Sequence, residues 1–238
     1  MQFVNENLKF PSCLLSDCDG VIVDSEKIAD AIMLEVLREV FTSDALEANM
    51  TNMFGGRVID IIMLLEKRLG VTLSPEKRSL MQMDIDARVA REAPNMPNVK
   101  EVYESLGIPV AIVSNSAPQR LHLSVRRAGL ADLVGKNMFS GDEVNRPKPA
   151  PDVYLQAARV MGISPAQCLV IEDSVTGVTA AKAAGMLVLG FLGGGHIRSH
   201  HAELLTKAGT QKLFDNMTEL PQVIQSLSLS TSMIVNNL

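Results

Sequence analysis

The sequence predicts an α/β fold, a doubly wound, Rossmann-like parallel sheet with an α-helical cap domain inserted into it. Short apolar runs alternate with amphipathic helical segments after Pro94, as is typical of parallel strands joined by right-handed crossovers. Before Pro94, residues 26–92 contain helical patterns and no good strand. We therefore expect a discontinuous α/β core of residues 1–24 and 93–238 and a helical cap of residues 25–92.

The first strand and the cap helices follow from the spacing of apolar residues. Residues 13–16 form a short apolar run typical of a buried strand. Over residues 28–40 apolar side chains recur at helical spacing, and Ser25 stands where it can cap the N-terminus of that helix. Two more cap helices are expected at 58–69 and 75–89, the second after a Ser-Pro-Glu start.

The core that follows the cap alternates between strands and helices. We expect strands at 108–113, 138–139, 168–171 and 186–191, and helices at 99–106, 118–128, 152–161 and 175–184. Gly129, Gly162 and Gly185 follow the last three of these helices, where the tolerance of glycine for a left-handed backbone conformation makes it a good helix stop. The tail from Ser226, with its Ser and Asn residues, is expected to be frayed.

Composition excludes several classes of function. The 238 residues carry a net charge of −5, which argues against a nucleic-acid partner because affinity for nucleic-acid phosphates comes mainly from Lys and Arg. No apolar run approaches the ~18 residues of a membrane span, and the N-terminus has no signal-peptide core, so we expect no membrane association. Cys13, Cys18 and Cys168 lack metal-binding spacing, and we interpret them as reduced thiols of a cytoplasmic protein.

Polar residues directly follow the first four strands expected in the core. They are Asp17 and Asp19 after the first, Ser114, Asn115 and Ser116 after the second, Asp142, Arg146 and Lys148 after the third, and Glu172, Asp173 and Ser174 after the fourth. In open α/β sheets, ligands bind beyond the carboxyl ends of the strands. The sequence therefore predicts a site at this edge, built from acids, hydroxyls and a lysine.

The charge of that edge predicts a metal ion. Asp17, Asp19, Glu172 and Asp173 bring four carboxylates against the one ammonium of Lys148. Clustered like charges are unstable unless a cation compensates them. Oxygen ligands without His or Cys point to a hard dication, so we expect Mg²⁺ at this edge. The cation would also screen an attacking carboxylate from an anionic substrate.

Four sequence motifs lie at the C-terminal ends of these four strands, in the same order along the chain. They are DCDGVIVDS at 17–25, VSNS at 113–116, RPKPAPD at 146–152 and IEDSVTG at 171–177. Together they resemble the haloacid dehalogenase superfamily of phosphotransferases. The spelling of the first motif is common in that superfamily's phosphatases and sugar-phosphate mutases, the subgroup with a helical cap. The resemblance is specific because every motif follows a strand of its own.

The resemblance implies a set of catalytic residues. Asp17 would be the nucleophile that forms an aspartyl-phosphate, and Asp19 would protonate the leaving alcohol and then take a proton from the attacking water. Ser114 and the backbone amide of Asn115 would hold the phosphoryl oxygens. Lys148 would neutralise charge on the nucleophile and on the transferring group.

The resemblance also implies the metal ligands and the role of the cap. Mg²⁺ would be held by Asp17, the backbone carbonyl of Asp19, and Asp173, with Glu172 as a further ligand or as the residue that orients a metal-bound water. The cap would close over the site and read the leaving group. Arg57 follows two glycines in the cap, and we expect it to face the active site and bind substrate.

These features favour a phosphatase acting on a small phosphorylated metabolite, a sugar or sugar-acid phosphate, as a monomer or weak dimer. The alternative is a β-phosphoglucomutase-type isomerase. Such mutases tend to carry a His at the position of Ala29 and a cap loop of the form Gly-Val-x-Arg, whereas residues 55–58 read Gly-Gly-Arg-Val. A relative that binds a phosphorylated effector without turnover would lack Asp17 or Asp19, and both are present.

Asp24 and the histidines of residues 196–201 each allow more than one interpretation. Asp24 fits a catalytic role and a structural turn equally well. His196 and His200 would share a face on a helix, as metal-binding pairs do, but they follow three glycines. We therefore expect His196, His200 and His201 to lie at the surface or to cap a helix.

Overall fold

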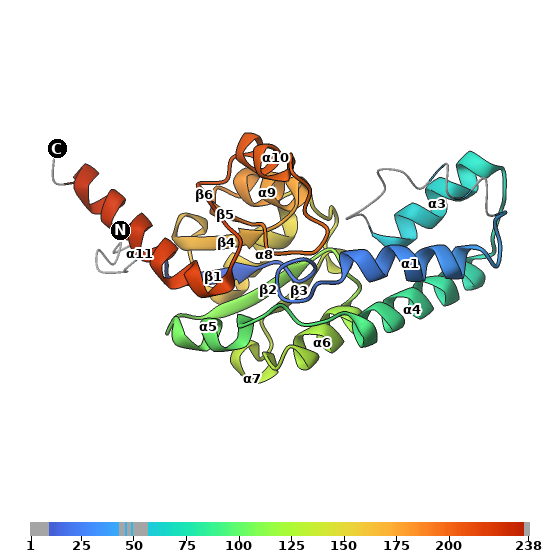
Figure 1. The fold of residues 1–238 in the computed structure, drawn as a ribbon, viewed down its shortest axis with the longest axis horizontal. Coiled ribbons are helices and arrows are strands. Elements are labelled where there is room, and N and C mark those ends of the chain that lie inside the picture. The colour runs from blue at the N-terminus through green and yellow to red at the C-terminus, as the bar shows by residue number, and fades with distance from the viewer. Residues whose placement is uncertain (1–9, 43–45, 47–48, 50–56, 236–238) are drawn as a thin grey trace.

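Six parallel strands form one sheet among the residues that the computed structural model describes, which are 10–42, 46, 49 and 57–235. The strand order is β3-β2-β1-β4-β5-β6, which confirms the doubly wound arrangement that the sequence predicts (Figure 1). The strands are β1 (Cys13–Ser16), β2 (Val110–Ser114), β3 (Met138–Ser140), β4 (Cys168–Glu172), β5 (Leu187–Phe191) and β6 (Lys212–Phe214). Because all pairs are parallel, the carboxyl ends of the strands meet at one edge.

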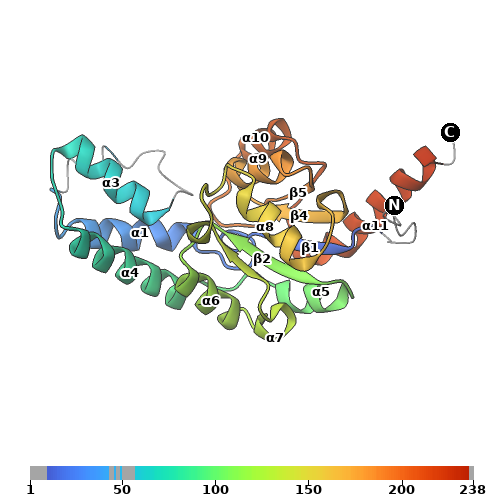
Figure 2. The ribbon, with the colours of Figure 1, turned by 180° about the vertical axis from the view of Figure 1, so that it is seen from behind.

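Both faces of the sheet are buried because its central strands are apolar on both sides. Leu14 and Ile112 belong to one core, and their neighbours Leu15 and Val113 belong to the other. The first core is covered by α5 (Val99–Ser105), α6 (Pro118–Arg127), α7 (Ala131–Val134) and α11 (Leu220–Val235). The second is covered by α8 (Asp152–Met161), α9 (Val175–Ala183) and α10 (His201–Ala208), so the sheet lies between two helical layers (Figure 2). Short 3₁₀ turns span Gly141–Glu143, Pro165–Gln167 and Met217–Glu219.

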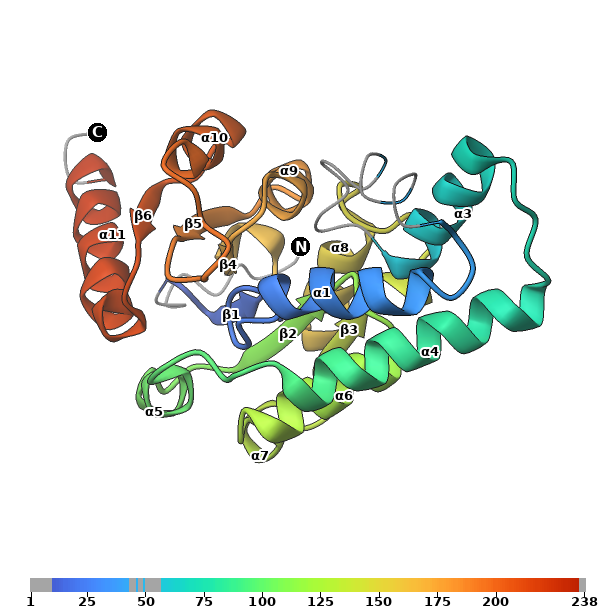
Figure 3. The ribbon, with the colours of Figure 1, turned by 45° about the vertical axis from the view of Figure 1, so that its right-hand side comes forward.

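In the part of the cap whose helices the structure describes in full, three helices extend from the carboxyl edge of the sheet as a separate lobe (Figure 3). They are α1 (Glu26–Leu37), α3 (Val58–Leu69) and α4 (Pro75–Glu92). Their apolar faces enclose a core of their own, in which Ile62 and Ile85 are fully buried. Helix α4 begins as the sequence predicts, because the Ser74 hydroxyl caps its first turn, and it also packs against α6 of the core.

The C-terminal part differs from the sequence-based expectation. Helix α10, strand β6 and helix α11 all follow β5, and apolar spacing predicted none of them. The expectation of a frayed tail from Ser226 is wrong for residues 226–235, because α11 continues to Val235, and residues 236–238 of that tail lie outside the described residues. Leu220 and Leu227 bury this helix against the core, and Lys212 Nζ donates to Ser226 Oγ at 2.6 Å. Tertiary packing therefore stabilises a helix whose Ser-rich sequence is locally weak.

Two further observations bear on the expectations drawn from composition. Cys13, Cys18 and Cys168 are buried free thiols, and the sulfurs of Cys13 and Cys168 lie 3.4 Å apart across the paired strands β1 and β4. Within the described ranges, none of the helices has both the length and the apolar character that crossing a membrane requires.

Candidate active site

The loop after β1 brings Asp17 and Asp19 to the edge of the sheet. Asp17 donates its backbone N–H to the Ile171 carbonyl at 3.0 Å, which extends the pairing of β1 with β4 by one residue. The chain then turns at Gly20, whose φ of +78° suits glycine. A Cβ on Gly20 would lie 1.8 Å from Asp173 Oδ2. This glycine therefore also allows the first and fourth motifs to approach each other.

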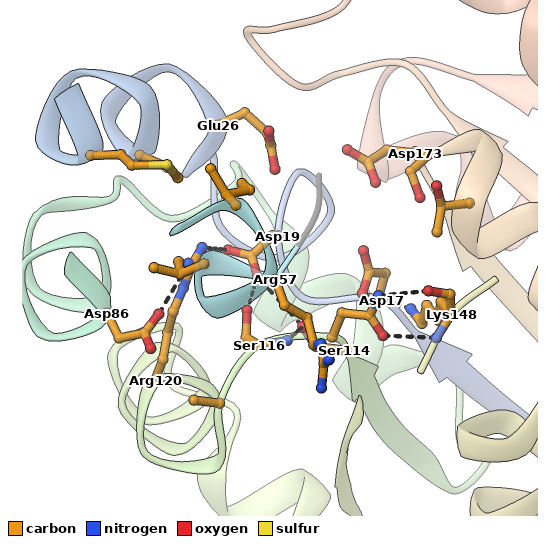
Figure 4. Close-up of a pocket in the computed structure, with 18 of the residues that line it drawn as sticks. Asp17, Asp19, Glu26, Arg57, Asp86, Ser114, Ser116, Arg120, Lys148 and Asp173 are labelled. Carbon is orange, nitrogen blue, oxygen red and sulfur yellow. Dashed lines mark hydrogen bonds and ion pairs between the residues drawn. The ribbon is translucent and has the colours of Figure 1, made fainter. Parts of the chain in front are cut away.

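A cavity of about 290 Å³ lies at this edge, between core and cap (Figure 4). Its core side is lined by the sequence-predicted residues Asp17, Asp19, Ser114, Asn115, Lys148 and Asp173. Its cap side is lined by Glu26, Ala29, Asp30, Arg57 and Asp86. The strand ends therefore converge on one cavity, and Arg57 reaches it from the cap. Glu172 is fully buried beneath this surface.

Lys148 is buried at the centre of the core side. Its Nζ donates to Asp17 Oδ1 at 2.9 Å, to Glu172 Oε1 at 2.7 Å and to the Val113 carbonyl at 2.8 Å. Three acceptors use all three ammonium protons. Burial alone would lower the pKa of Lys148, but the carboxylates of Asp17 and Glu172 outweigh burial and raise that pKa well above its usual range. The side chain is therefore a fixed positive charge beside Asp17.

Glu172 is held by donors on both of its oxygens. Oε1 accepts from Lys148 Nζ and from Tyr154 Oη, the latter at 2.8 Å. Oε2 accepts from the Ser174 hydroxyl at 2.9 Å and from the Ser174 N–H at 3.3 Å. A carboxylate fixed in this way positions Lys148 against the nucleophile candidate.

Asp19 is held by three side chains from both domains. Ser116 Oγ donates to one carboxylate oxygen at 2.6 Å, Ser25 Oγ donates to the other at 2.5 Å, and the Arg120 guanidinium pairs with that second oxygen. Arg120 also lies 3.5 Å from Asp86 of α4. Burial on its own would raise the pKa of Asp19, but Arg120 and the two hydroxyls lower it. This arrangement therefore favours the ionised form of Asp19.

The second motif fastens the loop that carries Lys148. The side-chain oxygen of Asn115 accepts the Lys148 N–H at 3.0 Å, and its Nδ2 donates to the Lys148 carbonyl at 3.1 Å. Ser114 ends β2, and its hydroxyl accepts the N–H of Ser116 at 3.0 Å. Both Ser114 and Asn115 line the cavity. The Asn115 side chain therefore fixes the backbone of the loop that carries Lys148.

Asp17, Glu172 and Asp173 form a carboxylate cluster that fits a divalent cation. One oxygen from each lies within 4.8 Å of the other two, and all three residues are buried. The pKa values of Asp17 and Asp173 are raised well above their usual range, first by burial and then by the charge of Glu172. A buried excess of negative charge with only oxygen donors suits Mg²⁺. The Asp19 side chain is turned toward Arg120, so its backbone carbonyl is the part available for a cation.

Arg57 joins the cap to the core at the cavity wall. Its Nε donates to Asp60 of α3 at 2.8 Å, and one of its terminal nitrogens donates to Asp142 of the Gly141–Glu143 turn at 3.1 Å. The side chain is 26% exposed. One of its ion-pair partners, Asp60, belongs to the cap and the other, Asp142, belongs to the core. Arg57 therefore links the cap to the core.

Sequence reasoning missed two residues of the site that come from core helices. Arg120 carried a readable signal, because it lies beside Leu121 on the buried face of α6, where a charge needs a partner. Tyr154 carried no signal, because a tyrosine at apolar spacing in α8 reads as core packing. Its role depends on Glu172, which is 18 positions away in the sequence.

The expectation for the histidines was wrong for two of the three. His196 and His201 line the cavity, whereas His200 is exposed. The metal pair of His196 and His200 on one helical face does not form, because α10 begins at His201. A Gly-rich loop carries His196 back over the strand ends, and nothing in local spacing reveals that path.

Comparison with known proteins decides the family. The profile of the haloacid dehalogenase-like hydrolases matches residues 11–185, which include all four motifs. The chain belongs to this family. One relative of this haloacid dehalogenase-like hydrolase is the 6-phosphogluconate phosphatase of Escherichia coli K12, 24% identical over 209 residues that cover 87% of this chain and 91% of the relative.

Two other proteins extend the comparison. Hexitol phosphatase B of Escherichia coli K12 is 27% identical to this hydrolase over 176 residues, which cover 71% of the chain and 78% of the relative. A crystal structure of a haloacid dehalogenase family hydrolase from Deinococcus radiodurans, with bound phosphate and sodium, is 32% identical. It superposes with a TM-score of 0.67 and covers 90% of this chain and 94% of its own.

Proposed function

We propose that this hydrolase is a magnesium-dependent phosphatase that cleaves a small phosphorylated metabolite through an aspartyl-phosphate on Asp17. The observation that carries the proposal is the setting of Asp17. Its carboxylate lines the cavity, accepts from Lys148 at 2.9 Å and belongs to the carboxylate cluster with Asp173. A nucleophile, a fixed cation and a set of metal ligands therefore stand together at the end of one cavity. The names of the phosphatase relatives support the same reaction.

The first half-reaction moves the phosphoryl group onto the protein. An oxygen of Asp17 bonds to phosphorus while the bond from phosphorus to the leaving-group oxygen breaks. Lys148 offsets the negative charge that Asp17 brings to the phosphate, and the Ser114 hydroxyl and the Asn115 amide hold phosphoryl oxygens. Bound Mg²⁺, held by Asp17 and Asp173, would supply Lewis-acid stabilisation of the transferring group.

Asp19 handles the protons of both half-reactions. The protonated form of Asp19 gives its proton to the leaving alcohol and becomes a carboxylate. This carboxylate then takes a proton from the water whose oxygen bonds to phosphorus, while the bond from phosphorus to Asp17 breaks, so phosphate leaves and both the Asp17 carboxylate and the proton on Asp19 are restored. Arg120 favours the ionised form of Asp19, which is the form that accepts a proton from water. The arginine therefore prepares Asp19 for hydrolysis of the phosphoenzyme.

Replacing Arg120 by Met is expected to lower kcat about 100-fold and to move the acidic limb of the kcat–pH profile to higher pH. Without the guanidinium, burial dominates and raises the pKa of Asp19, so more of this carboxyl is protonated at a given pH and unable to accept a proton. Asp86→Asn is the matched control, because it removes the second partner of Arg120 and keeps the first. An acidic limb that stays in place in the Met variant would contradict this role.

Hydrolysis is favoured over sugar-phosphate isomerisation by the residue at position 29. Ala29 lines the cavity at the position where β-phosphoglucomutases tend to carry a His. A methyl group cannot exchange a proton with a sugar hydroxyl. NMR of a hexose 1-phosphate incubated with the protein and Mg²⁺ therefore distinguishes the two reactions. Free phosphate is the expected product, and accumulation of the 6-phosphate would overturn the choice.

The charges around the cavity favour an uncharged leaving group, a sugar or sugar alcohol. Among the lining side chains that the structure describes, Lys148, Arg57 and Arg120 each already pair with two carboxylates of this chain. Glu26 and Asp30 add two acids to the cap side. Burial raises the pKa of Glu26 to about 7 and that of Asp30 to about 6. Above these pKa values both groups are ionised, so a carboxylate on the leaving group would meet like charges there.

A panel of phosphorylated metabolites tests the proposed function and this preference together. With Mg²⁺ present, kcat/KM for a hexitol 6-phosphate is expected to exceed that for 6-phosphogluconate at least about 10-fold, since juxtaposed like charges are strongly unfavourable. Asp30→Asn should raise kcat/KM for the sugar acid while changing that for the hexitol phosphate little. Phosphate release from no member of the panel would refute the phosphatase, and a preference for the sugar acid would refute the charge argument alone.

A further inference from the structure

The loop between β5 and α10 reaches the site although no motif of the family resemblance includes it. His196 lies in this loop and His201 begins α10, and both line the cavity. We propose that His196 and His201 are positioning residues that hold Asp173 in the orientation needed to bind Mg²⁺. This inference rests on the proposed metal-dependent function and adds two residues to its machinery.

The two histidines hold different parts of the same aspartate. His196 Nε2 lies 3.1 Å from Asp173 Oδ2, and His201 Nε2 lies 2.5 Å from the Asp173 carbonyl oxygen. The side chain and the backbone of Asp173 are therefore each tied by one ring. The rings meet edge to face with their centroids 5.7 Å apart, so each also fixes the other. The Asp173 side chain is 4% exposed and that of His196 is 22% exposed, so solvent has little access to their contact.

The loop that carries His196 is itself fastened to the first motif. Gly195 donates its N–H to Asp24 Oδ1 at 2.9 Å, across 171 positions of the sequence. A Cβ on Gly194 would lie 2.8 Å from the His196 ring, and one on Gly20 would lie 3.1 Å from it. The glycines thus let the ring settle between the two loops. Asp24, which fits a turn or a catalytic role on sequence grounds, here anchors the loop that holds His196.

The geometry fits a supporting role better than direct ligation. The group of potential ligands that gathers within 4.8 Å among the described residues consists of the carboxylates Asp17, Glu172 and Asp173 and includes neither histidine. Residues outside the first ligand shell orient the carboxylates that bind a hard cation, and this strengthens metal binding. Holding Asp173 before the cation arrives reduces the conformational entropy that binding must remove.

Calorimetric titration of the full-length protein with Mg²⁺ tests this proposal without relying on turnover. His196→Ala and His201→Ala are each expected to weaken Mg²⁺ binding about 10- to 100-fold, the usual effect of removing an outer partner of a metal ligand. His200→Ala is the matched control, since His200 lies in the same segment but is exposed, and its affinity should equal that of the wild type. His196→Gln restores a nitrogen donor near the Nε2 position and should recover most of the affinity.

The outcomes separate this inference from the proposed function. Unchanged or tighter Mg²⁺ binding by both alanine variants would overturn the inference. The proposed function would still stand in that case, provided that the wild type binds Mg²⁺ and releases phosphate. A wild type that binds no Mg²⁺ would overturn both. Thermal unfolding in EDTA verifies that each variant is folded, and the glutamine variant supplies the comparison if an alanine variant is not.

Discussion

Asp17→Asn is expected to lower phosphate release about 10,000-fold or more, to the limit of detection. The amide that replaces the carboxylate is a poor nucleophile, so the covalent phosphoenzyme cannot form. The substitution changes volume little, and Lys148 keeps its contacts with Glu172 and the Val113 carbonyl. Loss of activity should therefore come without loss of fold.

Two measurements check this prediction. Release of phosphate from an aryl phosphate with Mg²⁺ follows turnover, and intact-protein mass spectrometry after rapid acid quench detects the phosphoenzyme in the wild type only. Asp132→Asn, an exposed acid of α7, is the control and should behave as the wild type. Phosphate release by Asp17→Asn within about 10-fold of the wild type would exclude Asp17 as the nucleophile.

Lys148→Met is expected to destabilise the metal-free protein by about 3–5 kcal/mol and to lower kcat about 1,000-fold. The Lys148 ammonium lies between the buried carboxylates of Asp17 and Glu172, and its removal leaves two negative charges without their cation. Turnover falls because the same ammonium offsets the charge of the nucleophile as it approaches phosphate. Urea unfolding at pH 7 and steady-state kinetics with Mg²⁺ measure the two effects.

The stability that Lys148→Met loses is expected to depend on pH. Burial and the charge of Glu172 raise the pKa of Asp17 even with Lys148 present. Without Lys148, the folded state therefore binds more protons than the unfolded state. The stability deficit of Lys148→Met should therefore grow as pH rises and shrink toward pH 5. Adding Glu172→Gln should recover part of the stability and none of the activity. Lys136→Met replaces an exposed lysine and is the control. If Lys148→Met had the same free energy of unfolding in urea as this control, the stabilising role of Lys148 would be contradicted.

The fold could be predicted because its central strands are unambiguous. Strands β1, β2 and β4 are buried on both faces, so they read as continuous apolar runs bounded by polar residues. The elements after β5 could not be predicted in the same way. Lys212–Phe214 is too short to show a period, and the Ser-rich sequence of α11 becomes helical only because Leu220 and Leu227 pack on the core.

The candidate site was predictable to the extent that it lies at strand ends. Asp17, Ser114, Glu172 and Asp173 each stand directly after or at the end of a strand, and parallel strands must end at one edge. Arg120 and His196 come instead from a helix face and a glycine loop. Their partners, Asp19 and Asp173, are distant in the sequence, so no local spacing connects them.

By itself, the sequence determined which chemical groups this hydrolase brings to one edge of its sheet, because buried strands must be apolar and the polar residues that end them are then conspicuous. The tertiary structure alone decided how those groups are paired. Lys148 meets Asp17 across 131 positions, and Arg120 meets Asp19 across 101. Charges buried at such distances in sequence are stable only with partners, and the crossovers of the sheet and the packing of cap on core determine which partners they meet.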